Sequence, residues 1–203
     1  SISITADPTG LVAGQYTQTI TATASGYIED EIDVMLTVAG DSGSLSGSVG
    51  SSAANVNLTT EGSADWVHWA LTSSSSVNRK SGVTEQISDI SASGRAGRRF
   101  LGGDARTQYS WNDGTPTGST STRAGLYFSG GGNSVQFTVA ADTTPRTLRV
   151  HLGGYQARGR IEVNLSDGTV PPFVTTVQDL SNPFDRVLTV NFQAASAGQT
   201  LTF

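Results

Sequence analysis

The chain has 203 residues and a formal net charge of −5 at pH 7, and only 14% of its residues are charged. This length suits one large β-sandwich, or a medium one joined to a small module. A chain of this size can bury a hydrophobic core without stabilisation by a metal or disulfides. The net negative charge gives the chain as a whole no basic surface for a polyanion, so nucleic acid is not expected as a partner. Since there is no cysteine, thiol catalysis and thiolate metal sites are excluded.

The sequence gives no sign of membrane insertion. No stretch approaches the roughly 18 apolar residues that a spanning helix needs, and residues 1–5 carry no basic or apolar leader pattern, so an export signal would lie outside this sequence. A single lysine and heavy use of Ser, Thr and Gly resemble modules of bacterial extracellular proteins. An extracellular or cell-surface location is therefore expected.

Residues 1–39 are expected to form strands of a small first module. Polar and apolar residues alternate over 15–24 and again over 32–38, which is the pattern of half-buried strands. The segment Pro8–Tyr16, followed by these Thr-rich and aliphatic strands, resembles the C-terminal half of a bacterial immunoglobulin-like repeat. Two or three strands cannot be stable alone, so this partial repeat is expected to pack on the next domain or to belong to a longer multidomain chain.

The boundary between modules is placed near Gly40. The Ser/Gly-rich run from Asp41 to Ser52 has the composition of a flexible linker or of a first, loosely ordered strand. Residues 40–203 then form the main module.

Short strands separated by turns predict that residues 40–203 are an antiparallel β-sandwich, with a jelly roll of eight to ten strands as the expected form. The Asn112–Gly114, Gly153–Gly154 and Ser166–Gly168 segments supply turn residues. The predicted strands are Ala54–Thr59, Trp66–Leu71, Gly82–Ile90, Arg106–Trp111, Gly125–Phe128, Val135–Val139, Thr147–Leu152, Ile161–Leu165, Val187–Gln193 and Thr200–Phe203.

Two tryptophans lie close together in residues 61–71. In a strand, Trp66 and His68 share one face and Trp69 lies on the other, so the two indoles point in opposite directions. An exposed indole beside a histidine and a carboxylate could bind a sugar, because a pyranose packs its C–H face on an aromatic ring while polar neighbours fix its hydroxyls. The alternative is that both indoles seal opposite sheet layers and that His68 merely bonds to the backbone.

A second aromatic pair, Tyr109 and Trp111, leads into the polar turn that contains Asp113. Loops at strand ends are where β-sandwiches usually bind ligands, although Trp111 could equally be a core residue that precedes an ordinary turn. The candidate ligand-binding residues are Trp66, His68, Tyr109, Trp111 and Asp113.

The segments Asp65–Trp69 and Trp111–Thr115, with the closing residues Leu201–Phe203, resemble accessory β-sandwich modules of bacterial polysaccharide-degrading enzymes. This resemblance covers residues 45–203 and implies glycan binding. The expected partners are a polysaccharide or glycan and further domains of the same parent chain. It assigns no residue role.

Metal binding is considered from the aspartates in expected loops. A structural calcium ion could use carboxylate and carbonyl oxygens there, but no spacing matches an EF-hand, and Asp in a turn usually serves the backbone. The aspartates concerned are Asp104, Asp113, Asp142 and Asp167.

No enzyme motif is present. His68 and His151 are the two histidines and cannot supply a three-histidine zinc site, and neither a Gly-x-Ser-x-Gly elbow nor a phosphate loop occurs. No pair of carboxylates stands out for a glycosidase, whereas a Ser-His-Asp arrangement stays open. The expected function is a non-catalytic carbohydrate-binding module, and the alternative is a structural or adhesive spacer of a surface protein or filament.

Overall fold

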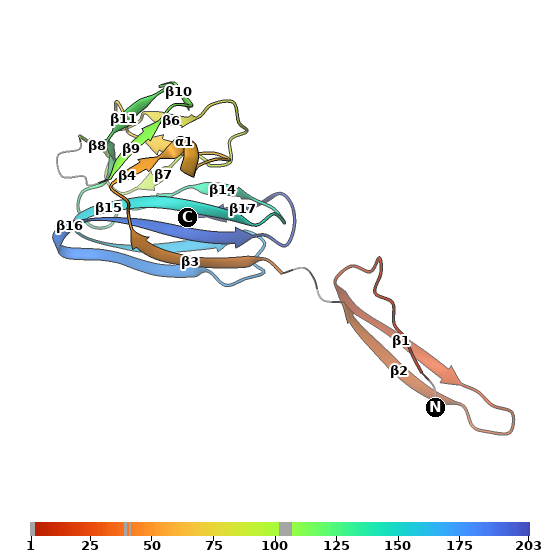
Figure 1. The fold of residues 1–203 in the computed structure, drawn as a ribbon. Helices are drawn as coiled ribbons and strands as arrows, with labels where there is room; N and C mark the ends of the chain where they lie inside the picture. The colour runs from red at the N-terminus through yellow and green to blue at the C-terminus, as the bar shows by residue number, and fades with distance from the viewer. Residues whose placement is uncertain (1–2, 39, 41, 102–106) are drawn as a thin grey trace. The chain divides into compact units, whose positions relative to one another are not determined.

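A computed structural model describes residues 3–38, 40, 42–101 and 107–203 (Figure 1). The chain divides into two compact units, Ser1–Ser42 and Gly43–Phe203, and this division lies close to the boundary expected at Gly40.

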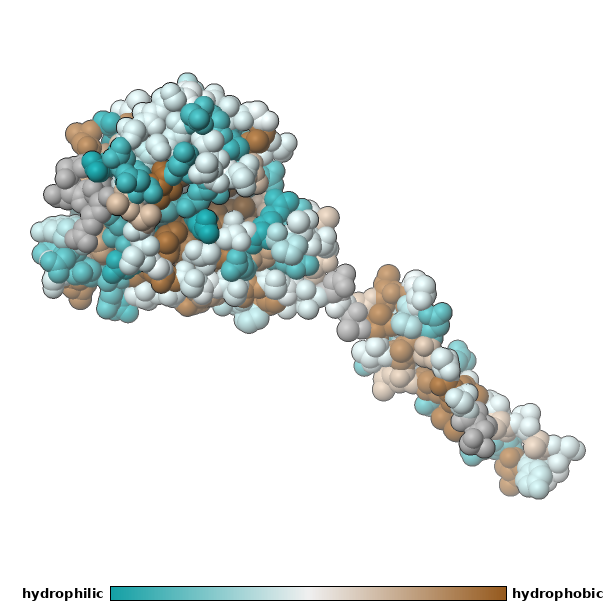
Figure 2. All heavy atoms as spheres, viewed as in Figure 1, coloured by the Kyte–Doolittle hydropathy of each residue, from teal (hydrophilic) through white to brown (hydrophobic). Residues whose placement is uncertain are grey.

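The first unit contains one antiparallel hairpin of β1 (Gly14–Ala22) and β2 (Asp30–Val38). Its register places Tyr16 opposite Leu36 and Ile20 opposite Ile32, so apolar side chains of both strands share one face. The two predicted strands are confirmed. Much of the apolar surface is exposed, Ile20 and Ile32 included, and Figure 2 shows hydrophobic atoms along this hairpin. The likeness to an immunoglobulin-like repeat stays a prediction.

The second unit is built on a five-stranded sheet with the order β14-β17-β15-β16-β3. The predicted all-β, sandwich-like class is confirmed, and its ladders are antiparallel apart from one parallel pair in a smaller sheet. The strands are β3 (Ser44–Ser51), β14 (Thr138–Ala141), β15 (Arg146–Leu165), β16 (Phe173–Gln193) and β17 (Gln199–Thr202). The Ser/Gly-rich segment after the boundary is thus a regular strand, β3, rather than a flexible linker.

The long hairpin of β15 and β16 folds back on itself. The two strands are paired at 17 positions. If the hairpin were fully extended, its tip would lie about 55 Å from its open end. Instead the tip contacts the open end: the Gly43 amide donates to Thr169 Oγ1 at 3.0 Å, and the Ala195 amide donates to Asp167 Oδ2 at 2.8 Å. Both strands therefore bend, and the sheet becomes two layers (Figure 1).

The bend lies where the pairing register shifts between Tyr155 and Ala157. Tyr155 pairs with Pro183 and Ala157 with Asp179, so residues 180–182 bulge out of β16. Thr147–Leu152 and Ile161–Leu165, predicted as two strands, are parts of one strand, and the predicted turn at Gly153–Gly154 is wrong. The glycine pair is compatible with both structures, because glycine favours bulges within a strand as well as turns between strands.

The main core fills the space between the two layers of the folded hairpin. Leu188, Val190, Val163 and Leu201 are fully buried, and they come from both halves of the hairpin and from β17. Gly47 of β3 shows how closely the layers approach, because a Cβ there would lie 2.6 Å from the ring of Phe173 in the opposite layer.

Residues 55–136 lie beside the folded hairpin and form several short sheets around a second, smaller core. We call these residues the apical part. Its elements are β4 (Asn55–Asn57), α1 (Leu58–Glu61), β5 (Val67–Trp69), β6 (Val77–Lys80), β7 (Ser91–Ser93), β8 (Arg98–Phe100), β9 (Gln108–Trp111), β10 (Gly114–Thr115), β11 (Thr120–Thr122), β12 (Gly125–Tyr127) and β13 (Ser134–Gln136).

Several predicted strands of the apical part need correction. Ala54–Thr59 gives only the three-residue β4, because the chain turns into α1 at Leu58. Gly82–Ile90 is not a strand and makes one isolated bridge, from Ile87 to Val139, since its apolar residues pack as a loop against the main core. The start of Arg106–Trp111 lies outside the described residues, and its remainder is β9.

Candidate functional site

The residues predicted to bind a ligand come together in the apical part. The ring centroids of Trp66 and Trp111 are 5.1 Å apart, and the His68 ring lies 5.1 Å from that of Trp111 and 6.0 Å from that of Tyr109. Asp113 joins them through Trp66. The sequence segments that were singled out separately therefore form one cluster.

This cluster is the apical core rather than an open platform. Trp66 and Trp111 each expose 3% of their surface, and His68 is buried as well. Val56, Leu58 and Leu71 pack around the indoles. Rings packed in this way have no free face for a sugar, so the arrangement matches the alternative in which the tryptophans seal a core.

The third tryptophan points the other way, as the strand periodicity predicted. Trp69 packs against the main core, with its ring centroid 5.6 Å from that of Phe137. Its Nε1 is buried without a hydrogen-bond partner in the described structure. The segment Trp66–Trp69, which includes β5, therefore anchors the apical part, with Trp66 in the apical core and Trp69 against the main core.

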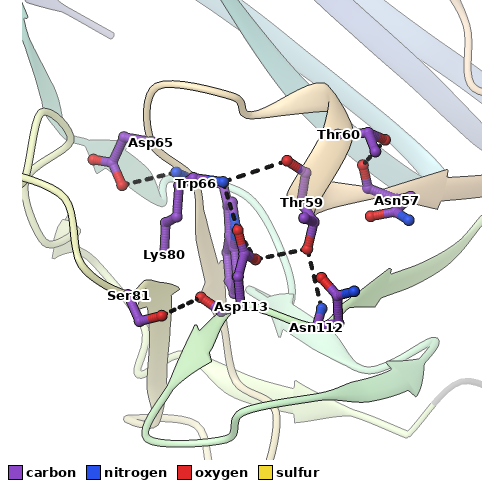
Figure 3. A network of polar contacts seen from close by, with 9 residues as sticks. All are labelled: Asn57, Thr59, Thr60, Asp65, Trp66, Lys80, Ser81, Asn112 and Asp113. Atoms are coloured by element: carbon purple, nitrogen blue, oxygen red, sulfur yellow. Dashed lines mark hydrogen bonds and ion pairs between the residues drawn. The ribbon is translucent and has the colours of Figure 1, made fainter.

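Asp113 is the centre of a closed polar network (Figure 3). Its Oδ1 accepts hydrogen bonds from Thr59 Oγ1 at 2.6 Å and from Trp66 Nε1 at 3.0 Å, and its Oδ2 pairs with Lys80 Nζ at 2.5 Å. Its main-chain oxygen accepts from both the amide and the hydroxyl of Ser81. Burial raises the pKa of Asp113, but the hydrogen bonds from Lys80, Thr59 and Trp66 together outweigh it and lower the pKa below its ordinary value.

The network joins α1, the residue before β5, β6 and the turn after β9 at one carboxylate. Both of its oxygens are already engaged by protein donors, which leaves Asp113 a role in fixing these elements. The lone lysine of the chain is used as the counter-ion of this carboxylate.

His68 is held as a neutral imidazole. Its Nε2 donates to the Ala124 carbonyl at 3.0 Å, and its Nδ1 is buried without a partner in the described structure. Burial lowers the pKa of His68, although the bond to Ala124 acts in the opposite direction. A buried, uncharged ring between Trp111 and Tyr109 serves as a packing residue.

The aspartates considered for calcium serve their own turns. Asp142 accepts from the Thr144 amide and pairs with Arg146, and Asp167 accepts from the amides of Thr169 and Ala195. Asp104 lies outside the described residues. Among the residues that are described, no three His, Cys, Asp or Glu side chains gather as a candidate metal site.

An exposed aromatic ring that the sequence reading missed lies at the bend of the folded hairpin. Tyr155 is 68% exposed, and Leu180 in the bulge opposite is 65% exposed. Gln156 is the unpaired residue of β15 between Tyr155 and Ala157. Its φ is 47°, a left-handed conformation that glutamine rarely adopts. Such strain is retained where the surrounding structure imposes it, and it gathers at functional sites.

The loop opposite Tyr155 is fixed by a local cap. Asp179 Oδ1 accepts from the amides of Ser181 and Asn182 at 2.9 and 2.8 Å, which is the Asx-turn geometry that stabilises a tight bulge. Exposed polar side chains flank the ring within three residues along β15 and β16, namely Gln156, Arg158, Gln178 and Asn182. We call Tyr155, Leu180 and these four residues the bend surface.

Comparison of the chain with family models, with curated proteins and with solved structures finds no match in any of the three. In the described part of the chain, no helix has the length and apolar character to cross a membrane.

Proposed function

We propose that this chain is a glycan-binding module of a secreted bacterial protein, that it does not act on the glycan it binds, and that it binds through the bend surface. The single observation that carries the proposal is the Tyr155 ring, which stands 68% exposed on a strained bulge. The apolar face of the tyrosine ring is not stabilised by contact with water, whereas a sugar can cover it with a C–H face.

The neighbours of Tyr155 supply the rest of a sugar site. The amides of Gln156, Gln178 and Asn182 can both donate and accept, and Arg158 can donate, so they suit hydroxyls that do both. The capped loop and the paired strands hold the backbone beneath these side chains in place before a ligand arrives, which reduces the entropy lost on binding.

The experiment is native gel electrophoresis through a panel of neutral and acidic polysaccharides. We expect at least one polysaccharide to retard the wild-type chain, and Tyr155→Ala to remove the retardation, because losing about 1.4 kcal/mol weakens binding tenfold. Tyr27→Ala is the matched control, since Tyr27 is 81% exposed and belongs to the other unit. Equal retardation of Tyr155→Ala and wild type, or no retardation by any polysaccharide, would refute the proposal.

A structural or adhesive spacer is the second candidate, and two observations favour it. Trp66 and Trp111 are sealed in a core, and the β1–β2 hairpin exposes an apolar face that includes Ile20 and Ile32. A spacer would leave the polysaccharide panel without effect and would show self-association or binding to neighbouring domains through the hairpin. The same gels therefore distinguish the two candidates.

A further inference from the structure

Three polar side chains distant in sequence meet beside the outer face of β15. Ser52 follows β3, Glu61 ends α1 and His151 lies in β15. His151 Nδ1 is 3.3 Å from Ser52 Oγ, and His151 Nε2 is 2.6 Å from Glu61 Oε1. The imidazole is thus held between a hydroxyl and a carboxylate.

The carboxylate determines which nitrogen of the neutral imidazole carries the proton. An ionised Glu61 can only accept, so Nε2 carries the hydrogen and Nδ1 keeps a lone pair directed at the Ser52 hydroxyl. The hydrogen bond from His151 lowers the pKa of Glu61 and outweighs the desolvation that raises it. Glu61 is therefore ionised at neutral pH and holds the tautomer in which His151 can accept a proton from Ser52.

The surroundings restrain the imidazole without sealing the hydroxyl. The His151 and Glu61 side chains are 12% and 24% exposed, and the Tyr109 ring meets the His151 ring edge-on at 5.4 Å. Across the sheet, His151 pairs with Val187, and Val187 pairs with Gly50. Ser52 itself is partly exposed.

We propose that Ser52, His151 and Glu61 form a nucleophilic site that hydrolyses carboxylic esters, an activity independent of the proposed glycan binding. A nucleophile bonded to a base that a carboxylate orients is the arrangement that activates serine. The imidazole is turned relative to the usual triad, because Nδ1, rather than Nε2, faces the serine.

The reaction balances with these groups and water alone. Ser52 Oγ attacks the ester carbonyl carbon as its proton moves to His151 Nδ1. The C–O bond to the alcohol then breaks, and the alcohol leaves with the proton from Nδ1, which leaves Ser52 acylated. Water attacks the acyl carbon and gives its proton to Nδ1, and that proton returns to Ser52 Oγ as the carboxylic acid leaves.

Arg149 lies beside the carboxylate rather than beside the serine. It is two residues from His151 in β15, in the row of Ser48, whereas Ser52 follows the row of Leu152 on the other side of His151. Its Nη1 is 3.8 Å from Glu61 Oε2, and its charge helps to lower the pKa of Glu61.

The first test uses a fluorophosphonate probe and 4-nitrophenyl acetate with the full chain. We expect the probe to label Ser52, as identified by mass spectrometry, and Ser52→Ala to lose both labelling and ester hydrolysis, a fall of about 100-fold or more. Ser51→Ala, at the exposed neighbouring serine, is the matched control and should keep both. Absence of labelling at Ser52, or hydrolysis by Ser52→Ala equal to that of wild type, overturns the proposal.

The second test examines Glu61 as a positioning residue. Glu61→Gln should lower kcat and leave KM nearly unchanged, because the amide no longer fixes the tautomer in which Nδ1 accepts the Ser52 proton, and Glu61→Asp should recover part of the lost kcat. A structural role alone would lower the amount of folded protein and leave kcat per folded molecule unchanged. The polysaccharide gels and the ester assay are separate readouts on the wild-type chain, so failure of glycan binding and failure of hydrolysis are distinguishable.

Discussion

Trp66 Nε1 donates a hydrogen bond to Asp113 Oδ1 at 3.0 Å, although the two residues are 47 positions apart in the chain. The bond explains why two segments that looked like separate sugar-binding features are one packing unit. The aromatic ring is buried, and the carboxylate satisfies its only polar atom.

Replacement of Asp113 by Asn should destabilise the protein by about 2 kcal/mol, because the partly buried Lys80 ammonium loses its counter-ion and meets amide hydrogens instead. Urea unfolding followed by circular dichroism measures this change. Asp142→Asn removes the pair with Arg146, whose side chains are 34% and 30% exposed for Asp142 and Arg146, and should leave the unfolding midpoint nearly unchanged. Equal effects of the two variants would contradict the network described for Asp113.

His68 should make the folded state less stable as the pH falls below about 6.5. Its pKa is lowered in the folded protein, mainly by burial, so the unfolded chain binds a proton first, and stability is lost from the unfolded pKa downward. The carboxylates with lowered pKa values act only at lower pH. His68→Gln should flatten the slope of the unfolding free energy between pH 7 and 5.5, and an unchanged slope would show that His68 is not responsible.

Glycan binding should leave tryptophan emission unchanged. Trp66 and Trp111 are sealed, and Trp69 packs on Phe137 in the main core, so none of the three can stack on a sugar at the bend surface. Acrylamide should quench the emission weakly in the folded chain and strongly after unfolding. A ligand-induced shift of tryptophan emission would place the site at the apical cluster instead.

The closeness of the two layers should make Gly47 intolerant of a side chain. Gly47→Val would push methyl groups into the ring of Phe173 and should cost about 1–3 kcal/mol. Gly50→Ala on the same strand meets only Val187 at ordinary contact distance and should be neutral or slightly stabilising. Thermal melts compare the two, and similar melting temperatures would argue against the folded hairpin.

Local pattern predicted the strand periodicity well. The alternation of Leu148 and Val150 with Arg149 and His151 correctly indicated one face in the core, and the opposite directions of Trp66 and Trp69 followed from the same rule. The bend could not be predicted in this way, because Gly153 and Gly154 suit a turn as well as a bulged strand, and only the long-range pairing decides between them.

The candidate site shows a similar limit. The sequence picked out Trp66 and Trp111 because tryptophan is rare, but burial depends on tertiary packing, which periodicity does not report. No local pattern singles out Tyr155, which follows the turn-like pair Gly153–Gly154. The one available signal was an aromatic residue next to a turn-like segment, which has the same form as the Trp111 segment. Ser52, Glu61 and His151 carry no shared motif and meet only through the fold.

The most direct measurement is amide NMR mapping during titration with a polysaccharide fragment that retards the protein. We expect chemical-shift changes centred on residues 154–158 and 178–183, around Tyr155, with the amides of Trp66 and Trp111 unmoved. Changes centred on the apical cluster, or no changes at the bend while binding occurs, would contradict it.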